Sequence, residues 1–371
     1  MSNEMNRRDF LKATAATGVV FCSCGLLDAV YAQQPVEQQP AARPRLPVVV
    51  KGKRIKTIDV HAHCHFRDVE PLLGAEASVL TPPVNGAQEA FIEIEKRLKA
   101  MDGQGVDMEV LSINPFWYGK DRDLAAQIVK IQNEKLAELC AAKADRFAAF
   151  ASLTLQAPEL AVQELETAIK KQGLRGAAIG GWIAGDEFSN PKFHPVWAKA
   201  EELGAVLFIH PQGMPELSKR LAGNGWLGNT IANPLETTIA LSHLIFEGTL
   251  DRFPGLKIIA AHGGGYLPSY ADRSDHACFV GPAGCDPKIT LKKKPTEYLK
   301  QLYFDCLVFT PEAIRHLAAQ VGSSQIVMGS DYPYPWQLHP VDHIFACTSL
   351  TEKEKLAILG GTAVRLLRIT S

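Results

Sequence analysis

The chain has 371 residues, of which 46% are hydrophobic and 21% are charged, and its formal net charge is −1. This composition is typical of a folded globular protein with a large core. The near-neutral charge, without a basic stripe interleaved with aromatic residues, gives no reason to expect a nucleic-acid partner.

The first 32 residues predict an export signal. The pair Arg7-Arg8 precedes a small-residue, apolar run over 13–27, and Ala32 closes a suitable cleavage site. The pattern resembles a twin-arginine signal, which is removed after export and takes no part in the fold. We therefore expect a periplasmic protein that uses the twin-arginine export machinery.

The next stretch, residues 33–50, is rich in Gln, Pro and Ala without periodicity, which predicts a linker ahead of one folded domain over 51–371. Six cysteines follow the linker without any C-x-x-C pair, so they indicate neither a disulfide framework nor a zinc ribbon. An oxidising periplasm would permit Cys278 and Cys285 to pair.

Strand-like and helix-like segments then alternate. The expected strands cover 55–60, 108–113, 147–152, 176–179, 205–209, 257–261, 302–305 and 326–328. The expected helices cover 89–101, 124–144, 158–171, 194–203, 234–247, 266–276, 311–319, 351–359 and 362–367. This order favours parallel strands with crossover helices, and hence a single (β/α)₈ TIM barrel. The alternative is an open doubly wound sheet, although His262-Gly263-Gly264-Gly265 lacks the spacing of a dinucleotide-binding turn.

Residues of metal-binding type stand at the ends of four of these strands. His61 and His63 follow the first, His210 follows the fifth, His262 follows the sixth and Asp331 follows the eighth. Residues two apart on a strand point to the same side, and the carboxyl ends of barrel strands carry the chemistry. The pattern therefore predicts a metal site at this rim. The alternative is a set of rim histidines that only complete their hydrogen bonds.

The chain from Ile55 to Ile369 resembles the amidohydrolase-related family, in the branch that contains aminocarboxymuconate-semialdehyde decarboxylase and related aromatic-acid decarboxylases. The motifs that carry the resemblance are Asp59-Val60-His61-Ala62-His63, Phe208-Ile209-His210-Pro211, Ala261-His262-Gly263-Gly264-Gly265 and Gly329-Ser330-Asp331-Tyr332-Pro333. The resemblance implies one divalent metal ion held by His61, His63, His210 and Asp331, with His262 as the catalytic histidine. Zinc is the first choice, and manganese also accepts imidazole and carboxylate.

The resemblance favours metal-dependent, non-oxidative decarboxylation of an aromatic or muconate-semialdehyde-like carboxylic acid. A divalent ion activates water or polarises a substrate oxygen, and His262 suits the role of general base. Asp331, a ligand that can also carry a proton, is the candidate donor to carbon. The alternative is a metal-dependent hydrolase of a lactone, ester or C–C bond on the same site. A non-catalytic binding protein on a barrel scaffold is a third hypothesis.

Four residues are candidates for binding the substrate. Arg273 matches an arginine that reaches in from a neighbouring subunit in the decarboxylase, which implies a homodimer with a shared site. The decarboxylase also has an arginine in the loop after strand 1, which is missing over 75–88, and Arg67 is the candidate substitute. Trp117 and Trp182 follow strands 2 and 4, where they could pack on a flat substrate. The alternatives are a surface position for Arg273 and core positions for the tryptophans.

Overall fold

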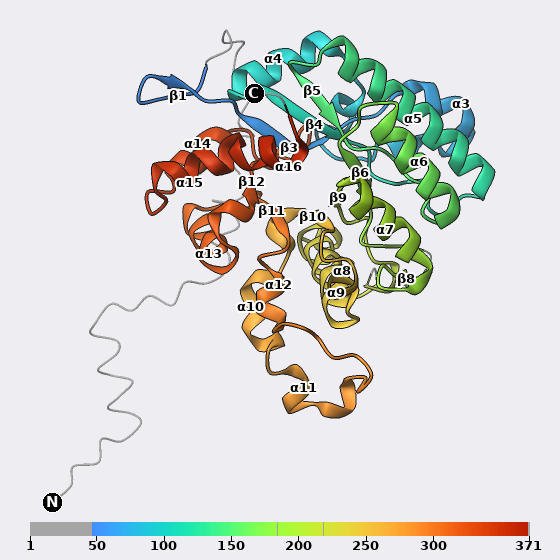
Figure 1. Ribbon diagram of the computed structural model, residues 1–371. Helices are drawn as coiled ribbons and strands as arrows, with labels where there is room; N and C mark the ends of the chain where they lie inside the picture. Colours follow the sequence, from blue (N-terminus) through green and yellow to red (C-terminus); the bar gives the residue numbers. More distant parts are fainter. Residues whose placement is uncertain (1–46, 184, 218, 370–371) are drawn as a thin grey trace, which may run out of the picture. The chain divides into compact units, whose positions relative to one another are not determined.

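The computed structural model describes residues 47–369, except 184 and 218 (Figure 1). The expected signal (1–32) and the linker up to residue 46 lie outside the described residues. The described part begins with a hairpin of β1 (Val49–Val50) and β2 (Lys53–Arg54), whose two turn residues both have positive φ. Within the described residues, no helix has the length and apolar character needed to cross a membrane.

Eight parallel strands form the centre of the fold. In chain order they are β3 (Ile58–His63), β4 (Met108–Ser112), β5 (Phe147–Ala149), β6 (Gly176–Ile179), β9 (Val206–Ile209), β10 (Lys257–Ala260), β11 (Tyr303–Asp305) and β12 (Ile326–Val327). They pair in that order in a three-stranded and a five-stranded sheet. A parallel bridge between Ala151 and Ala177 joins the sheets, and bridges from Asp59 and Ala62 to the segment 328–332 close the ring. The expected TIM barrel is confirmed.

Helices follow the strands and surround them (Figure 1). The principal ones are α4 (Ile94–Gln104), α5 (Arg122–Ala142), α6 (Pro158–Lys170), α7 (His194–Leu203), α8 (Asn233–Phe246), α10 (Leu267–Ser274), α13 (Pro311–Val321), α14 (Pro340–Ala346), α15 (Glu352–Leu356) and α16 (Thr362–Leu367). Local signals set several ends: the Asp121 side chain accepts from two backbone N–H groups at the start of α5, and Gly204 with φ of 61° ends α7.

The core has two parts, one inside the barrel and one between the barrel and the helices. Inside the barrel, Ile58, Val60, Val110 and Phe208 belong to one buried cluster, which α16 covers from one end. Side chains of opposite parity, such as Leu111, pack with the helices instead. The alternation is that of strands buried on both faces.

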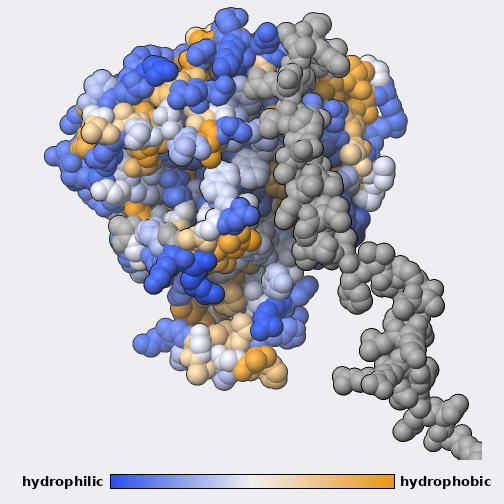
Figure 2. Space-filling model, turned by 180° about the vertical axis from the view of Figure 1, so that it is seen from behind, coloured by the Kyte–Doolittle hydropathy of each residue, from blue (hydrophilic) through white to orange (hydrophobic). Residues whose placement is uncertain are grey.

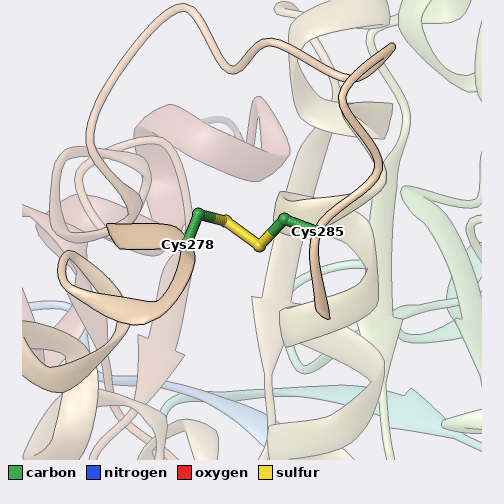
Figure 3. The surroundings of a disulfide bond; sticks show 2 residues. All are labelled: Cys278 and Cys285. Atoms are coloured by element: carbon green, nitrogen blue, oxygen red, sulfur yellow. A yellow bond between two sulfur atoms is a disulfide. The ribbon is translucent and has the colours of Figure 1, made fainter. Parts of the chain in front are cut away.

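A disulfide-bonded excursion follows α10. It contains α11 (Ala277–Val280) and stands away from the barrel in Figure 1. Cys278 and Cys285 form a disulfide within it (Figure 3). This is the pairing that the sequence permits in an oxidising compartment. Phe279 and Val280 are 88% and 76% exposed, and Figure 2 shows hydrophobic side chains at this end of the molecule.

A buried ion pair joins α4 to β4 on the outside of the barrel, and its loss should destabilise the fold. Arg97 Nε lies 2.5 Å from Glu109 Oε2, and both side chains are buried. Arg97→Met leaves the Glu109 carboxylate buried without its partner, so we expect the free energy of unfolding to fall by about 3–5 kcal/mol. Chemical denaturation measures it. The double variant Arg97→Met/Glu109→Leu should recover most of the loss, and a single-variant loss below about 1 kcal/mol would contradict the prediction.

Candidate metal centre and catalytic site

Three histidines and one aspartate converge at the carboxyl ends of the strands. His61 and His63 lie on β3, His210 follows β9 and Asp331 follows β12, and one ligand atom from each lies within 4.8 Å of the others. His61 Nε2 and His63 Nε2 are 3.1 Å apart. Asp331 Oδ1 is 3.3 Å from the first and 2.9 Å from the second. The structure therefore contains a metal site made of these four residues.

The chemistry of this donor set fits a divalent ion. Both ring nitrogens of His210 are buried without a hydrogen-bond partner among the described residues. Burial, helped by the neighbouring imidazoles of His63 and His61, holds the pKa of His210 well below its usual value. A buried ring nitrogen without a hydrogen bond destabilises the folded protein. The neutral imidazole is, however, the form that binds a metal ion.

The carboxylates of Asp331 and Asp305 place negative charge in the site, which a positive charge must balance. Burial opposes the ionised form of Asp331, yet His61 and the other imidazoles keep its pKa well below the usual value. In the same way burial opposes a charge on His61, but Asp331 and Asp305 raise its pKa to about 10. His61, His63, His210 and Asp331 would hold a divalent ion, which would supply this positive charge while the imidazoles stay neutral.

A bulge in β3 aims the two histidines into the site. β3 spans residues 58–63, whereas the first expected strand covers 55–60. The pairing of β3 with β4 shifts register between Asp59 and Ala62. Before the bulge Ile58 and Val60 lie in the interior cluster, whereas after it Ala62 packs in the outer cluster. One extra residue inverts the alternation of a strand. The bulge therefore lets His61 and His63 share the interior with Val60.

Asp305 orients His61, and the sequence analysis missed it. Asp305 ends β11, and its Oδ2 lies 2.6 Å from His61 Nδ1, which leaves Nε2 of His61 for the metal site. The same carboxylate accepts from the backbone N–H groups of His262, Gly263 and Leu307. The available signal was an acidic residue at the end of an expected interior strand, as with Asp331. Such partners fix the tautomer and orientation of a ligating histidine.

His262 lies beside the four ligands. Its ring centroid is 5.2 Å from those of His61 and His210, and its Nε2 is 3.7 Å from Asp331 Oδ2. His262 and Asp331 have φ of 55° and 67°, a strained conformation for residues other than glycine. The turn continues to Gly265, where a Cβ would lie 2.0 Å from the carbonyl oxygen of Pro234 on α8. The close approach to α8 therefore requires glycine there.

A cavity of about 800 Å³ opens above these residues. His210, His262 and Asp331 lie among its lining residues, which also include the aromatic side chains of Phe116, Trp226, Tyr334 and Trp336. Trp226 and Trp336 stack with ring centroids 5.8 Å apart and planes 9° apart. Neither tryptophan was among the expected substrate-binding residues, because they come from loops after β9 and β12 without a sequence signal.

The four expected substrate-binding residues do not line the cavity of their own chain. Trp117 is buried in the core and donates its N–H to the carbonyl oxygen of Leu153, so its packing is structural. Trp182 donates to the carbonyl oxygen of Gly213.

The two arginines lie outside the cavity as well. Arg67 pairs with Glu70 at 3.0 Å and covers the ring of Phe91. Arg273 is exposed on α10. A role of these four residues in binding substrate therefore stays a prediction.

The amidohydrolase family model matches residues 58–369. The chain belongs to this family. A second match, over residues 4–20, is to the signal sequence of the twin-arginine translocation pathway, which confirms the expected kind of signal.

Similar proteins of this family carry the names of decarboxylases. The 2-amino-3-carboxymuconate-6-semialdehyde decarboxylase of Dictyostelium discoideum is 32% identical over 73% of this chain and 75% of its own. The gamma-resorcylate decarboxylase of Rhizobium radiobacter is 30% identical over 82% of this chain and 96% of its own. The dihydroxybenzoic acid decarboxylase of Polaromonas sp. JS666, solved with manganese and 2-nitroresorcinol, is 26% identical and covers 85% of this chain and 97% of its own with a TM-score of 0.72.

Asp305 should control how tightly the site binds metal. Asp305→Asn removes the carboxylate that holds Nδ1 of His61, so we expect the affinity for a divalent ion to fall about 10- to 100-fold. Competition with a calibrated chelator, followed by elemental analysis, measures the affinity. Asp145→Asn changes an exposed aspartate and should leave it unaltered. Equal affinities in the two variants would contradict the role given to Asp305.

Proposed function

We propose that the protein is a metal-dependent, non-oxidative decarboxylase of an aromatic or muconate-like carboxylic acid. The observation that carries the proposal is the convergence of His262 with the four-ligand set beside a cavity lined by aromatic side chains. Flat aromatic walls suit a planar conjugated acid. The relatives named above support the same reaction type.

His61, His63, His210 and Asp331 are the residues that would hold one divalent ion. Three imidazoles favour zinc, as in other open catalytic sites. Manganese also accepts nitrogen and oxygen donors, and the Polaromonas relative holds manganese. When bound, the ion supplies a fixed positive charge that draws electron density from the oxygens of the acid.

The reaction breaks the bond between the ring carbon and the carboxylate and releases CO₂. The electron pair of that bond stays on the carbon, which must then take up one proton. We assign the transfer to Asp331 and its resupply to His262, whose Nε2 lies 3.7 Å from Asp331 Oδ2. Because the imidazoles hold the pKa of Asp331 low, a proton placed on Asp331 is readily given up.

His262 should be required for CO₂ release but not for metal binding. We expect His262→Ala to lower kcat/KM about 100- to 10,000-fold, because one positioned proton-transfer group is lost, with unchanged metal content. Release of CO₂ from a panel of hydroxylated aromatic acids measures activity, and His316→Ala on α13 is the matched control. The proposal is wrong if the fully metallated protein releases no CO₂ from any acid of the panel. Incorporation of labelled water oxygen without CO₂ would select the hydrolase instead.

We also propose a periplasmic location. The match to a twin-arginine signal supports export, and the disulfide between Cys278 and Cys285 suits an oxidising compartment. The homodimer stays a prediction, for which light scattering of the purified protein is the test.

The two arginines of the signal should decide the location. Replacing both Arg7 and Arg8 with lysine removes the pair that the export machinery reads, so we expect most of the protein to remain in the cytoplasm. Immunoblots of periplasmic and cytoplasmic fractions measure the distribution. Lys53→Arg, outside the signal, is the control, and an unchanged periplasmic fraction in the double variant would refute the proposal.

A further inference from the structure

His210 is the histidine ligand whose ring has no support from another side chain. Nδ1 of His61 lies 2.6 Å from Asp305 Oδ2, and Nδ1 of His63 lies 3.2 Å from Ser112 Oγ. Both ring nitrogens of His210 are buried without a hydrogen-bond partner among the described residues. A ligating histidine is normally oriented by a hydrogen bond at its other ring nitrogen. The orientation of His210 therefore depends on its packing and on the backbone that carries it.

Glu236 holds the backbone segment that follows His210. It lies in the first turn of α8, and its side chain is buried. Its Oε1 accepts from the backbone N–H of Gln212 at 2.8 Å, and its Oε2 accepts from that of Gly213 at 2.7 Å. Two consecutive peptide groups just beyond His210 are thus bound to one carboxylate. The carboxylate thereby fixes the direction in which the chain leaves β9.

The same carboxylate joins this segment to the neighbouring strand end. Oε1 of Glu236 also accepts from the backbone N–H of Gly181 at 3.0 Å, just beyond β6. The backbone N–H of His210 donates to the carbonyl oxygen of Ile179, the last residue of β6. A Cβ at Gly181 would lie 2.6 Å from Cγ of Glu236, so only a glycine there leaves room for the carboxylate. The ends of β6 and β9 are therefore tied together at His210 and again at Glu236.

Glu236 brings a buried negative charge to this contact. Burial raises the pKa of Glu236 to about 7, and the three backbone N–H groups act in the opposite sense. Hydrogen bonds to an ionised carboxylate are shorter and stronger than those between neutral groups. The ionised form of Glu236 therefore restrains the backbone most strongly. A neutral amide in its place would offer one acceptor oxygen instead of two.

We infer that Glu236 is a positioning residue that sets the metal-binding geometry of His210. It acts through the backbone of residues 211–213 rather than through contact with the imidazole. The role rests on the metal site of the proposed function and adds to it a residue outside the four ligands and their direct partners. The whole contact lies within one chain, so it is present whether or not the protein forms a dimer.

Removal of the carboxylate tests this role. Glu236→Leu keeps a side chain of similar size but removes all three acceptor contacts, so we expect the affinity for Zn²⁺ to fall at least about tenfold. Competition with a calibrated chelator measures the affinity and needs no substrate. Leu241→Ala is the matched control, because it opens a cavity further along α8 without removing a hydrogen bond from the segment. Unchanged affinity in Glu236→Leu, or an equal loss in the control, would overturn the inference.

A spectrum distinguishes positioning from a general loosening of the fold. Co²⁺ accepts the same imidazole and carboxylate ligands, and its visible absorption depends on how those ligands are arranged around it. With saturating Co²⁺, we expect the spectrum of Glu236→Leu to differ from that of the wild type, because His210 binds from a different position. Leu241→Ala should give the wild-type spectrum. A wild-type spectrum in Glu236→Leu would contradict the positioning role.

Glu236→Gln keeps the question open to test if Glu236→Leu does not fold. The amide retains at most two of the three contacts, and its NH₂ group then faces a backbone N–H. We expect the affinity for Zn²⁺ to fall at least about threefold, which is less than in Glu236→Leu, because part of the contact remains. An affinity equal to that of the wild type would refute the inference.

Metal binding and turnover together separate this inference from the proposed function. If the Glu236 variants lose metal affinity and the wild type releases no CO₂ from any acid, the positioning role stands and the decarboxylase is wrong. If the wild type releases CO₂ and the Glu236 variants bind metal as it does, the positioning role is wrong and the proposed function stands. A wild type that binds neither Zn²⁺ nor Co²⁺ removes both.

Discussion

The carboxylate of Asp305 is the contact on which the site most depends. It lies 2.6 Å from Nδ1 of His61 and accepts from the backbone N–H groups of His262 and Gly263. One side chain at the end of β11 thereby holds a metal ligand on β3 and the catalytic turn after β10. Hydrogen bonds to a buried carboxylate are stronger than neutral ones, and removal would leave several donors unpaired. The geometry of three strand ends therefore follows from one residue.

Closure of the barrel produces the same site. The last strand meets the first through Asp59, whose carboxylate accepts from Ser330, and through the backbone N–H of Asp331, which donates to the carbonyl oxygen of His61 at 2.8 Å. The two metal-binding segments are 270 positions apart in the chain, so they become neighbours only when the ring is complete. Stability of the closing contacts and integrity of the metal site are therefore linked.

The sequence predicted the barrel and the metal ligands because both leave periodic signals. His210 and Asp331 follow runs whose alternation already points them inward, and the expected helix over 194–203 matches α7. The orientation of His61 and His63 depends on a bulge, which has no signature in a single strand. Trp117 follows β4 in a loop, and the sequence of a loop does not show which way an aromatic side chain points. Its burial depends on tertiary packing alone.

The difference between strand ends and loops explains why the sequence indicates the reaction more clearly than the substrate. Strand ends supply the ligands and His262, and strands have fixed direction and spacing. Loops supply much of the cavity wall, including the stacked Trp226 and Trp336, and their conformation follows from contacts between segments far apart in the chain. Reaction type is therefore encoded in a few rim positions, whereas the choice of substrate is a property of the assembled wall.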